Sequence, residues 1–342
     1  MSTNHLIELY EELDDLEDSQ VKPPSIGRTS KKRLSKKHEM ETKLFLRAQE
    51  IAREFQFTYK AARFEEVWLL DALNDLAENN WISDVLRKVK GGKEASVYLC
   101  QTGQAVTDRP ENGWVAAKVY RPRMLRNLKN DAQYREGRID LDNEGRVIHK
   151  DADLHAMAKR TAYGEELRHQ SWIAYEFRAM QTLFEAGADV PRPYALTGNS
   201  ILMDFIGDEV VSAPTLSEVR LGRAESQPLF DRVLHNLEIL LANGFVHGDL
   251  SAFNILYWDG EIRLIDFPQV VSPVGNRNAF AIFKRDVTRI CDYFAKQGVQ
   301  SQPNRLAQDL WLRHGYKVQP EVHPRLLDPE DTRDRKRWEQ QD

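Results

Sequence analysis

Cysteine is scarce in this chain: only Cys100 and Cys291 occur among its 342 residues. The two form no CxxC pair, and the histidines form no cluster at metal-ligand spacing. This excludes a disulfide-stabilised fold and a zinc site built from cysteines. Isolated cysteines fit a reducing compartment, so we expect a cytoplasmic protein.

Long apolar runs are also absent. No stretch approaches the roughly 20 apolar residues that a membrane-spanning helix needs. The chain begins with the acidic sequence MSTNHLIELYEEL, whereas a secretory signal begins with basic residues. We therefore expect no contact with a membrane. A net charge of -5 argues against a protein that coats nucleic acid, although a local basic patch is compatible with it.

What the chain does contain is enough apolar sequence for a large core. Hydrophobic residues make up 41% of the sequence and charged residues 30%, which allows one two-lobed domain or two modest domains. Apolar periodicity predicts helices over residues 40–55, 64–79, 165–186, 226–243 and 280–297. Alternating apolar residues predict antiparallel strands over 85–92, 94–102 and 114–121, and a buried strand at 201–207.

The segment 121–160 is polar and rich in arginine, with little sign of a core. Within it, Asp140–Asp151 has the acidic spacing of a calcium loop, but it ends in Asp where such loops use a bidentate Glu. A surface hairpin that turns at Asp142-Asn143-Glu144-Gly145 explains this sequence better, because Asn, Asp and Gly form turns.

The most informative stretch is VHGDLSAFNI at Val246–Ile255, which is followed by LIDF at Leu264–Phe267. Kinase-like folds hold magnesium and nucleotide phosphates with an Asp and an Asn five residues apart and an Asp that closes the next hairpin. We assign Asp249 and Asp266 to catalysis, with Asp249 orienting and deprotonating the acceptor hydroxyl. Asn254 and Asp266 are the expected oxygen ligands of Mg²⁺. A simple turn would explain an isolated HGD but not this ordered set.

A lysine inside an apolar strand is the second informative feature. Lys118 lies in VAAKV at 115–119, and burying an unpaired ammonium group costs several kcal/mol. The phosphates of ATP and a helix carboxylate would together satisfy it. Glu176, in the apolar helix sequence WIAYEFRAM, is the expected partner. For the lysine alone, an edge-strand side chain that reaches solvent is the alternative.

The turn GGKEASVY at Gly91–Tyr98 is expected to cover the nucleotide, because its glycines let backbone N–H groups approach phosphate. Met203-Asp204-Phe205-Ile206 is the expected hinge whose backbone reads the adenine edge, although a buried strand end explains that sequence equally well. The expected nucleotide-binding residues besides Lys118 and Glu176 are Gly92, Lys93, Glu94, Ser96, Val97, Met203, Asp204 and Ile206.

These segments resemble the RIO kinases, an atypical family of serine/threonine protein kinases. The matching segments, in family order over about residues 55–297, are GKEASVY (92–98), AAKVYR (116–121), WIAYE (172–176), MDFIG (203–207), VHGDLSAFNILY (246–257), LIDFPQ (264–269) and FKRDV (283–287). Departures such as Gly-Gly before Lys93, where one branch has Ser-Thr-Gly, suggest a divergent and bacterial branch.

The resemblance implies an α+β, two-lobed fold of the protein-kinase type, reduced to a β-rich N-lobe and a small helical C-lobe. It also implies that the usual activation loop is missing. The expected organisation is an acidic segment and basic flexible linker (1–38), a helical extension packed on the N-lobe (39–84), the N-lobe (85–203) with an arginine-rich insertion (121–160), the C-lobe (204–300) and a peripheral tail (301–342).

The implied function is ATP- and Mg²⁺-dependent phosphorylation of protein serine or threonine, including autophosphorylation, or an ATPase switch on a ribosomal or other RNP particle. The alternative is a small-molecule kinase resembling the aminoglycoside or choline phosphotransferases, which share HGDLxxxN and IDF. GKEASVY and the short C-terminal portion argue against that alternative. A third hypothesis is an RNP-binding scaffold whose nucleotide state gates docking.

Overall fold

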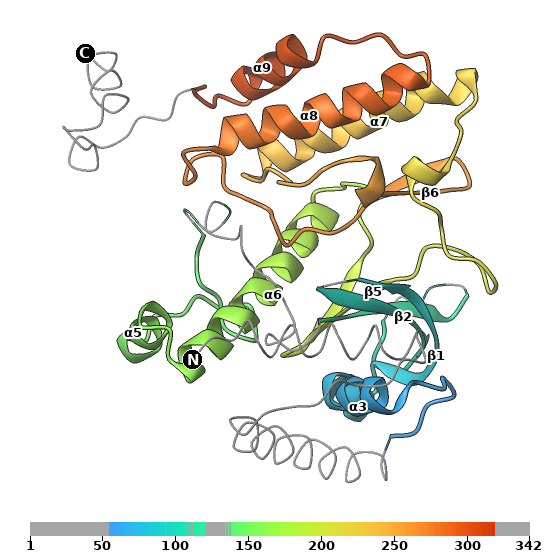
Figure 1. Ribbon diagram of the computed structural model, residues 1–342, viewed down its shortest axis with the longest axis vertical. Coiled ribbons are helices and arrows are strands. Elements are labelled where there is room, and N and C mark those ends of the chain that lie inside the picture. The colour runs from blue at the N-terminus through green and yellow to red at the C-terminus, as the bar shows by residue number, and fades with distance from the viewer. Residues whose placement is uncertain are drawn as a thin grey trace, which may run out of the picture. The chain divides into compact units, whose positions relative to one another are not determined.

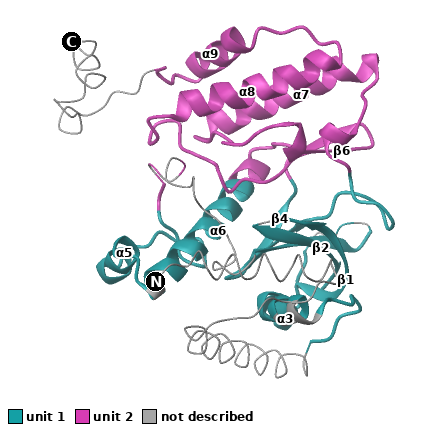
Figure 2. Ribbon diagram, in the orientation of Figure 1, with its two compact units in different colours: residues 1–129, 140–181, 191–213 teal, residues 130–139, 182–190, 214–342 magenta. Residues whose placement is uncertain are grey.

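The computed structural model describes residues 55–92, 94–107, 110, 112–120, 134, 136 and 138–318. Segment 1–38, nearly all of the helix expected over 40–55, Lys93 and most of 121–137 lie outside the described residues. The chain divides into two compact units, which Figure 2 colours separately. Unit 1 comprises residues 1–129, 140–181 and 191–213, and unit 2 comprises residues 130–139, 182–190 and 214–342.

The units do not follow the single lobe boundary that the sequence analysis places between residues 203 and 204. Residues 204–213 belong to unit 1, whereas residues 130–139 and 182–190 belong to unit 2. The chain therefore passes between the units several times.

Unit 1 is built on a five-stranded antiparallel sheet (Figure 1). Its order is β1-β2-β3-β5-β4, and its strands are β1 (Ile82–Gly91), β2 (Ala95–Thr102), β3 (Trp114–Tyr120), β5 (Ser200–Asp204) and β4 (Pro193–Leu196). The strands expected over 85–92, 94–102, 114–121 and 201–207 are all present, with ends shifted by a few residues.

The register of the sheet separates its side chains into two faces. Because opposite residues of neighbouring strands point to the same side, one row runs from Val97 through Lys118 to Ile201. A second row on that face runs from Leu99 through Ala116 to Met203. The residues between them in β2 and β3 point to the other face.

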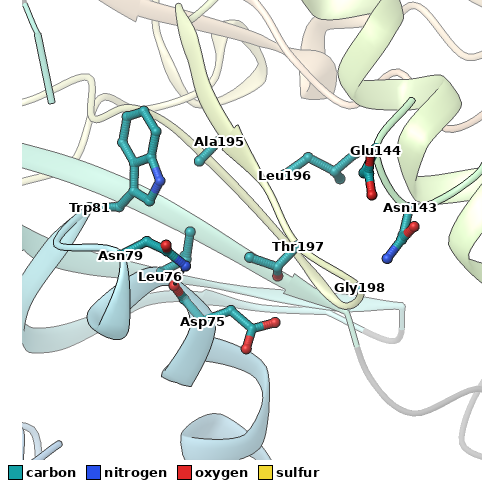
Figure 3. Close-up of a pocket in the computed structure, with 10 residues that line it drawn as sticks. All are labelled: Asp75, Leu76, Asn79, Trp81, Asn143, Glu144, Ala195, Leu196, Thr197 and Gly198. Atoms are coloured by element: carbon teal, nitrogen blue, oxygen red, sulfur yellow. Dashed lines mark hydrogen bonds between the residues drawn. The ribbon is translucent and has the colours of Figure 1, made fainter. Parts of the chain in front are cut away.

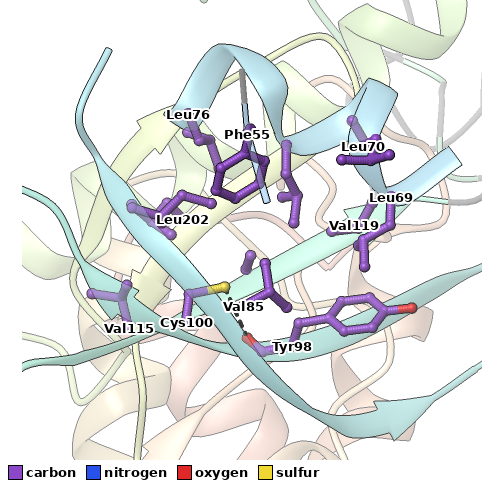
Figure 4. Close-up of a cluster of buried hydrophobic side chains, with 14 of the residues drawn as sticks. Phe55, Leu69, Leu70, Leu76, Val85, Tyr98, Cys100, Val115, Val119 and Leu202 are labelled. Atoms are coloured by element: carbon purple, nitrogen blue, oxygen red, sulfur yellow. Dashed lines mark hydrogen bonds between the residues drawn. The ribbon is translucent and has the colours of Figure 1, made fainter. Parts of the chain in front are cut away.

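That other face is the apolar core of unit 1 (Figure 4). Helix α3 (Arg63–Glu78) covers it with leucines that are almost completely buried. Their spacing of three and four residues places them on one stripe of the helix. The core comprises Phe55, Leu69, Leu70, Ala72, Leu73, Leu76, Ile82, Val85, Tyr98, Cys100, Val115, Ala117, Val119, Ala195 and Leu202.

Polar contacts at the edge of this core fix the helix on the sheet. The carboxylate of Glu65, in the first turn of α3, accepts a hydrogen bond from Tyr98 at 2.5 Å and pairs with Lys88 at 3.0 Å. Burial by itself would raise the pKa of Glu65, but these partners lower it. Helix α3, which lies in the predicted helical extension, thus packs on the sheet.

The polar segment after β3 contributes more to the structure than its sequence suggests. Asp142–Gly145 forms the predicted turn, closed by a bridge between Leu141 and Val147, and Gly145 takes a positive φ of 77°. The backbone N–H groups of Glu144 and Arg146 donate to the Asp142 carboxylate. Helix α5 (Asp151–Ala158) follows, and Leu141 and Met157 are buried, contrary to the expected lack of a core.

Helix α6 (Ala162–Glu185) is the long helix that the sequence predicts, and Gly187 ends it at a φ of 81°. Unit 2 then contains a two-stranded sheet of β6 (Ile255–Trp258) and β7 (Glu261–Leu264). Its helices are α7 (Arg223–Ala242), α8 (Ala279–Lys296), α9 (Pro303–Arg313) and the short η2 (Leu216–Glu218) and η3 (Ala252–Asn254). In the described part of the chain, no helix is long and apolar enough to cross a membrane.

Helices α7, α8 and α9 lie side by side in Figure 1. The rings of Phe230 in α7 and Phe294 in α8 are 5.3 Å apart, and those of Phe283 in α8 and Trp311 in α9 are 5.4 Å apart. Trp311 is 1% exposed. The expectation of a peripheral tail was therefore wrong for α9, because an indole that packs on α8 makes this short helix part of the core of unit 2.

We predict that Trp311→Ala lowers the free energy of unfolding by about 3–5 kcal/mol, because it leaves a cavity between α8 and α9. Urea unfolding of the full chain measures the change. Leu312→Ala is the matched control: its side chain is 51% exposed, so its effect should stay within about 0.5 kcal/mol. Equal, small effects of both substitutions would contradict the packing role of α9.

Candidate active site

The first group of candidate residues lies on the sheet face of unit 1 that faces away from α3. Lys118 Nζ is 2.7 Å from Glu176 Oε1, and the two residues are 9% and 1% exposed. The strand supplies the cation and α6 supplies the carboxylate, 58 residues later in the chain. The structure thus brings Lys118 and Glu176 together as the sequence predicts, while their role in nucleotide binding stays a prediction.

A residue that the sequence analysis did not identify completes this pair. The hydroxyl of Tyr120 donates to Oε2 of Glu176, so each oxygen of the carboxylate has a partner. Tyr120 follows Lys118 by two residues in β3 and therefore points to the same face. It is 1% exposed and packs edge-on against Trp172 of α6 at 5.3 Å.

The residues around the expected phosphate-covering turn are only partly gathered near Lys118. Val97 lies opposite Lys118 in the register. Gly92 follows β1 and lies so near β2 that an added Cβ would be 2.9 Å from the Ala95 carbonyl oxygen. Glu94 is part-exposed in the turn, and Lys93 lies outside the described residues.

Ser96 is placed differently from its expected role. It alternates with Val97 and lies opposite Val119, so its side chain points to the face covered by α3. It is completely buried there. The side chain of Ser96 is therefore not on the sheet face that carries Lys118.

The expected hinge residues are the last two residues of β5, Met203 and Asp204, and the two that follow it. Met203 lies opposite Ala116 on the Lys118 face. The side chain of Asp204 is used within unit 1: it accepts hydrogen bonds from the Tyr194 hydroxyl at 2.5 Å and from the Arg192 N–H at 3.0 Å. The carbonyl of Ile206 accepts from the Ala213 N–H at 2.9 Å, which fixes the orientation of that peptide group.

The second group of candidate residues lies in unit 2, in the loop that precedes β6. Gly248 has a φ of 85°, and a Cβ there would lie 2.1 Å from the carbonyl oxygen of Gln269, so only glycine fits. Asn254 Nδ2 donates to the backbone carbonyl of Asp249 at 2.9 Å. This hydrogen bond holds the Asn254 side chain against the backbone of Asp249.

Two charged side chains of helix α8 hold this loop, the buried Asp286 and the part-exposed Arg285. The Gly248 N–H donates to the Asp286 carboxylate at 2.8 Å, and the Gly248 carbonyl accepts from Arg285. Asp286 is completely buried. The sequence analysis used FKRDV only as part of a resemblance, and an acidic residue on the apolar face of an amphipathic helix was the signal of this role.

The carboxylate of Asp249 has a partner of its own. Arg289, one helical turn after Arg285, places Nη1 2.7 Å from Asp249 Oδ1. About 40% of each side chain is exposed, so solvent screens the pair and it orients the carboxylate more than it stabilises the fold. Sequence reasoning missed Arg289 because only the tertiary packing of α8 places it beside the loop.

Asp266 follows β7 in a backbone conformation that is rare for non-glycine residues, with a φ of 73°. On one side of it, the Ile265 N–H donates to the Asn254 carbonyl at 3.0 Å, and on the other Phe267 is completely buried. His247 Nε2 donates to the Ile265 carbonyl at 3.1 Å. Burial lowers the pKa of His247, so its ring is neutral at pH 7 and serves as a structural donor.

The donor chemistry of this loop fits Mg²⁺. In the described residues, no group of three or more His, Cys, Asp or Glu side chains could hold a metal ion by itself. Magnesium does not need such a cage, because it binds through one or two protein oxygens together with phosphates and water. An amide oxygen from Asn254 and a carboxylate from Asp266 match that requirement.

The two cysteines and the cavity in unit 1 are not part of the candidate active site. Burial raises the pKa values of Cys100 and Cys291, so neither thiol is an activated nucleophile. A cavity of about 230 Å³ lies in unit 1 at the end of α3 and the turn between β4 and β5 (Figure 3). None of the predicted site residues lines it.

We predict that Lys118→Met lowers the free energy of unfolding by about 3–5 kcal/mol, because it leaves the Glu176 carboxylate buried without its cation. The double substitution Lys118→Met/Glu176→Leu should recover most of this loss, since two apolar groups replace the pair. Chemical denaturation measures both. Arg305→Ala, which removes an exposed ion pair with Asp309, is the control and should change stability little. A double variant less stable than Lys118→Met would contradict this account.

Comparisons with known proteins support the resemblance seen in the sequence. The model of the RIO domain matches residues 97–306, more than half of the chain. The RIO-type serine/threonine-protein kinase Rio1 of Haloferax volcanii is 28% identical over 251 residues, which cover 73% of this chain and 77% of that protein. The serine/threonine-protein kinase RIO1 of Chaetomium thermophilum is 29% identical over 241 residues, which cover 68% of this chain and 43% of that protein.

A shorter match and a match to a solved structure were also found. Human serine/threonine-protein kinase RIO3 is 32% identical over 130 residues, which cover 38% of this chain and 25% of that protein. The crystal structure of the Rio2 kinase-ADP/Mg²⁺-phosphoaspartate complex from Chaetomium thermophilum matches with 21% identity and a TM-score of 0.49, covering 82% of this chain and 78% of that one. The expected family, the α+β kinase-like fold and the class of serine/threonine kinase are confirmed. The roles of single residues and a bacterial origin stay predictions.

Proposed function

Because the chain belongs to the RIO family of serine/threonine-protein kinases, we propose that it binds ATP with Mg²⁺ and phosphorylates a protein serine or threonine. The observation that carries most weight is the buried ion pair of Lys118 and Glu176. A charged lysine buried within a sheet is costly, and binding of ATP phosphates gives it a use that packing alone does not.

The proposed roles divide between the two units. In unit 1, Glu176 holds Lys118 in place, Tyr120 holds Glu176, and Lys118 binds the α- and β-phosphates. In unit 2, Asn254 and Asp266 hold Mg²⁺, which when bound would neutralise charge on the phosphates. Gly92, Lys93, Glu94 and Val97 stay proposed contacts of the nucleotide, as do the backbone groups of the segment 203–206, while Ser96 is left out.

The proposed reaction is an in-line displacement. The hydroxyl oxygen of the acceptor forms a bond to the γ-phosphorus while the bond between that phosphorus and the β–γ bridging oxygen breaks, and ADP leaves. Asp249 accepts the hydroxyl proton. Arg289 binds Oδ1 of Asp249, so we assign the proton to Oδ2. Most of the rate enhancement would come from positioning and charge neutralisation.

The acceptor and the partners belong to the proposal as well. We propose protein substrates and autophosphorylation, in a cytoplasmic setting, and a ribosomal or other RNP particle as the partner. An ATPase switch on such a particle would use the same residues, with water in place of the hydroxyl.

We predict that Asp249→Ala and Asp266→Ala each remove turnover, but for different reasons. Without Asp249 the proton has no acceptor, so the rate should fall about 10²- to 10⁴-fold while Mg²⁺-ATP binding is kept. Without Asp266 the Mg²⁺-dependent part of binding should be lost. Calorimetric titration with Mg²⁺-ATP separates these cases, with the exposed Asp292→Ala as control. Loss of binding in both variants would contradict the separate roles.

The proposed function itself is tested with γ-labelled ATP and Mg²⁺. The full chain is incubated alone, with a generic protein substrate, with ribosomal subunits and with an aminoglycoside panel. We expect label on serine or threonine. Free phosphate that increases with ribosomal subunits would indicate the ATPase switch instead. Label on an aminoglycoside would contradict the proposed acceptor, and absence of turnover in every mixture would leave a nucleotide-dependent scaffold.

A further inference from the structure

Arg87 is a partly buried cation that the proposed chemistry does not use. It lies in β1 opposite Leu99, and the register shifts between Val85 and Arg87, so a β-bulge precedes it. Bulges redirect side chains and occur often beside active sites. Because Leu99 continues across the sheet to Ala116 and Met203, Arg87 extends their row on the face that carries Lys118.

The guanidinium group of Arg87 has buried donors without acceptors. Its central carbon lies 5.7 Å from the ring centroid of Phe205, in the expected hinge. Nε and Nη2 are inaccessible to solvent, and neither finds a hydrogen-bond partner in the described part of the chain. Arginine stays charged under all physiological conditions, and unsatisfied buried donors on a charged group are costly. A bound ligand that offers acceptors would remove this cost.

The position of Arg87 in the sheet indicates which part of a nucleotide it meets. The rows of Lys118 and Ala116 are two residues apart along β3, about 7 Å. With phosphates at Lys118, the base and ribose therefore lie along the row of Ala116, Met203 and Arg87. The apolar side chains of this row suit the flat base, while the N–H groups of Arg87 need oxygen or nitrogen acceptors.

The geometry of the two unsatisfied donors indicates which acceptor atoms of the nucleotide they bind. Nε–H and Nη2–H lie on one edge of the planar guanidinium and point the same way, so they bind two adjacent acceptor atoms at once. The 2′ and 3′ hydroxyl oxygens of ribose are such a pair. We propose that Arg87 binds the ribose hydroxyls of the nucleotide and so selects ribonucleotides over deoxynucleotides. The inference rests on the proposed function, since it requires a nucleotide on this sheet face.

The nearest alternative partner is a carboxylate of the chain itself. Asp208 follows the hinge, and the charge of Arg87 contributes to lowering its pKa. However, Asp208 Oδ1 already accepts the backbone N–H groups of Val210 and Val211, at 2.9 and 2.7 Å. This carboxylate is thus used to close its own turn. An Asp208→Asn variant distinguishes a structural Arg87–Asp208 contact from ribose binding.

The test is equilibrium binding of Mg²⁺-ATP, Mg²⁺-2′-deoxy-ATP and Mg²⁺-3′-deoxy-ATP, measured by calorimetry without turnover. The wild-type chain should bind ATP about tenfold or more tightly than either deoxy analogue, as expected for hydrogen bonds from a charged donor. Arg87→Met should bind all three alike, at the affinity of the deoxy analogues. Arg87→Lys keeps the charge but lacks the paired donors, so it should also lose the preference. Asp208→Asn and the exposed Arg146→Met should retain it.

Four outcomes would overturn the inference. A wild-type chain that binds ATP without a preference for ribose would do so, as would an Arg87→Met variant that keeps the preference. Equal weakening of all three nucleotides in Arg87→Met and in Asp208→Asn would assign Arg87 a structural role. Failure of the wild-type chain to bind any of the nucleotides would instead overturn the proposed function, and the inference with it. Thermal unfolding of each variant shows that the compared proteins are folded.

Discussion

The constraint on which unit 1 depends is the burial of one ammonium group. Lys118 can lie inside a sheet only because Glu176 neutralises it, and Glu176 can lie inside a helix interface only because Lys118 and Tyr120 satisfy both of its oxygens. The pair thereby gives the sheet two unlike faces. One face is apolar and covered by α3, and the other carries fixed charges that can act on a ligand.

In unit 2, charged side chains fix a loop instead of a sheet face. The loop around Gly248 is held by two charged side chains of α8: the buried Asp286 accepts the Gly248 N–H, and the part-exposed Arg285 donates to the Gly248 carbonyl. The hydrophobic face of α8 packs against α7 and α9, and the anchor is as rigid as that packing. Loss of packing far from the loop, at Trp311 for example, would therefore be expected to loosen the candidate catalytic residues.

The sequence predicts those parts of the structure whose signal is local. Alternation located β1, β2 and β3, and charged residues within apolar segments singled out Lys118 and Glu176 as partners before any contact was known. Helix α9 was missed because it is short and lies among charges and prolines, and its apolar residues become meaningful only against α8. Tyr120 and Arg289 were missed for the same reason, since the hydrogen bond of each depends on which element packs beside it. Ser96 was assigned to the nucleotide from its motif, whereas strand alternation puts it on the opposite face.

Arg87 differs from Arg285, another partly buried arginine, in its hydrogen bonding. Arg285 also has one buried nitrogen without a partner, but its other nitrogens bind the Gly248 carbonyl and the Tyr134 hydroxyl, so its charge is used within the fold. Arg87 has the ring of Phe205 beneath it and, in the part of the chain that is described, no hydrogen bond. The fold itself supplies partners to the charged groups of Lys118 and Asp286. That it leaves the paired donors of Arg87 unmatched beside the expected hinge is more easily understood if their acceptors arrive with the nucleotide.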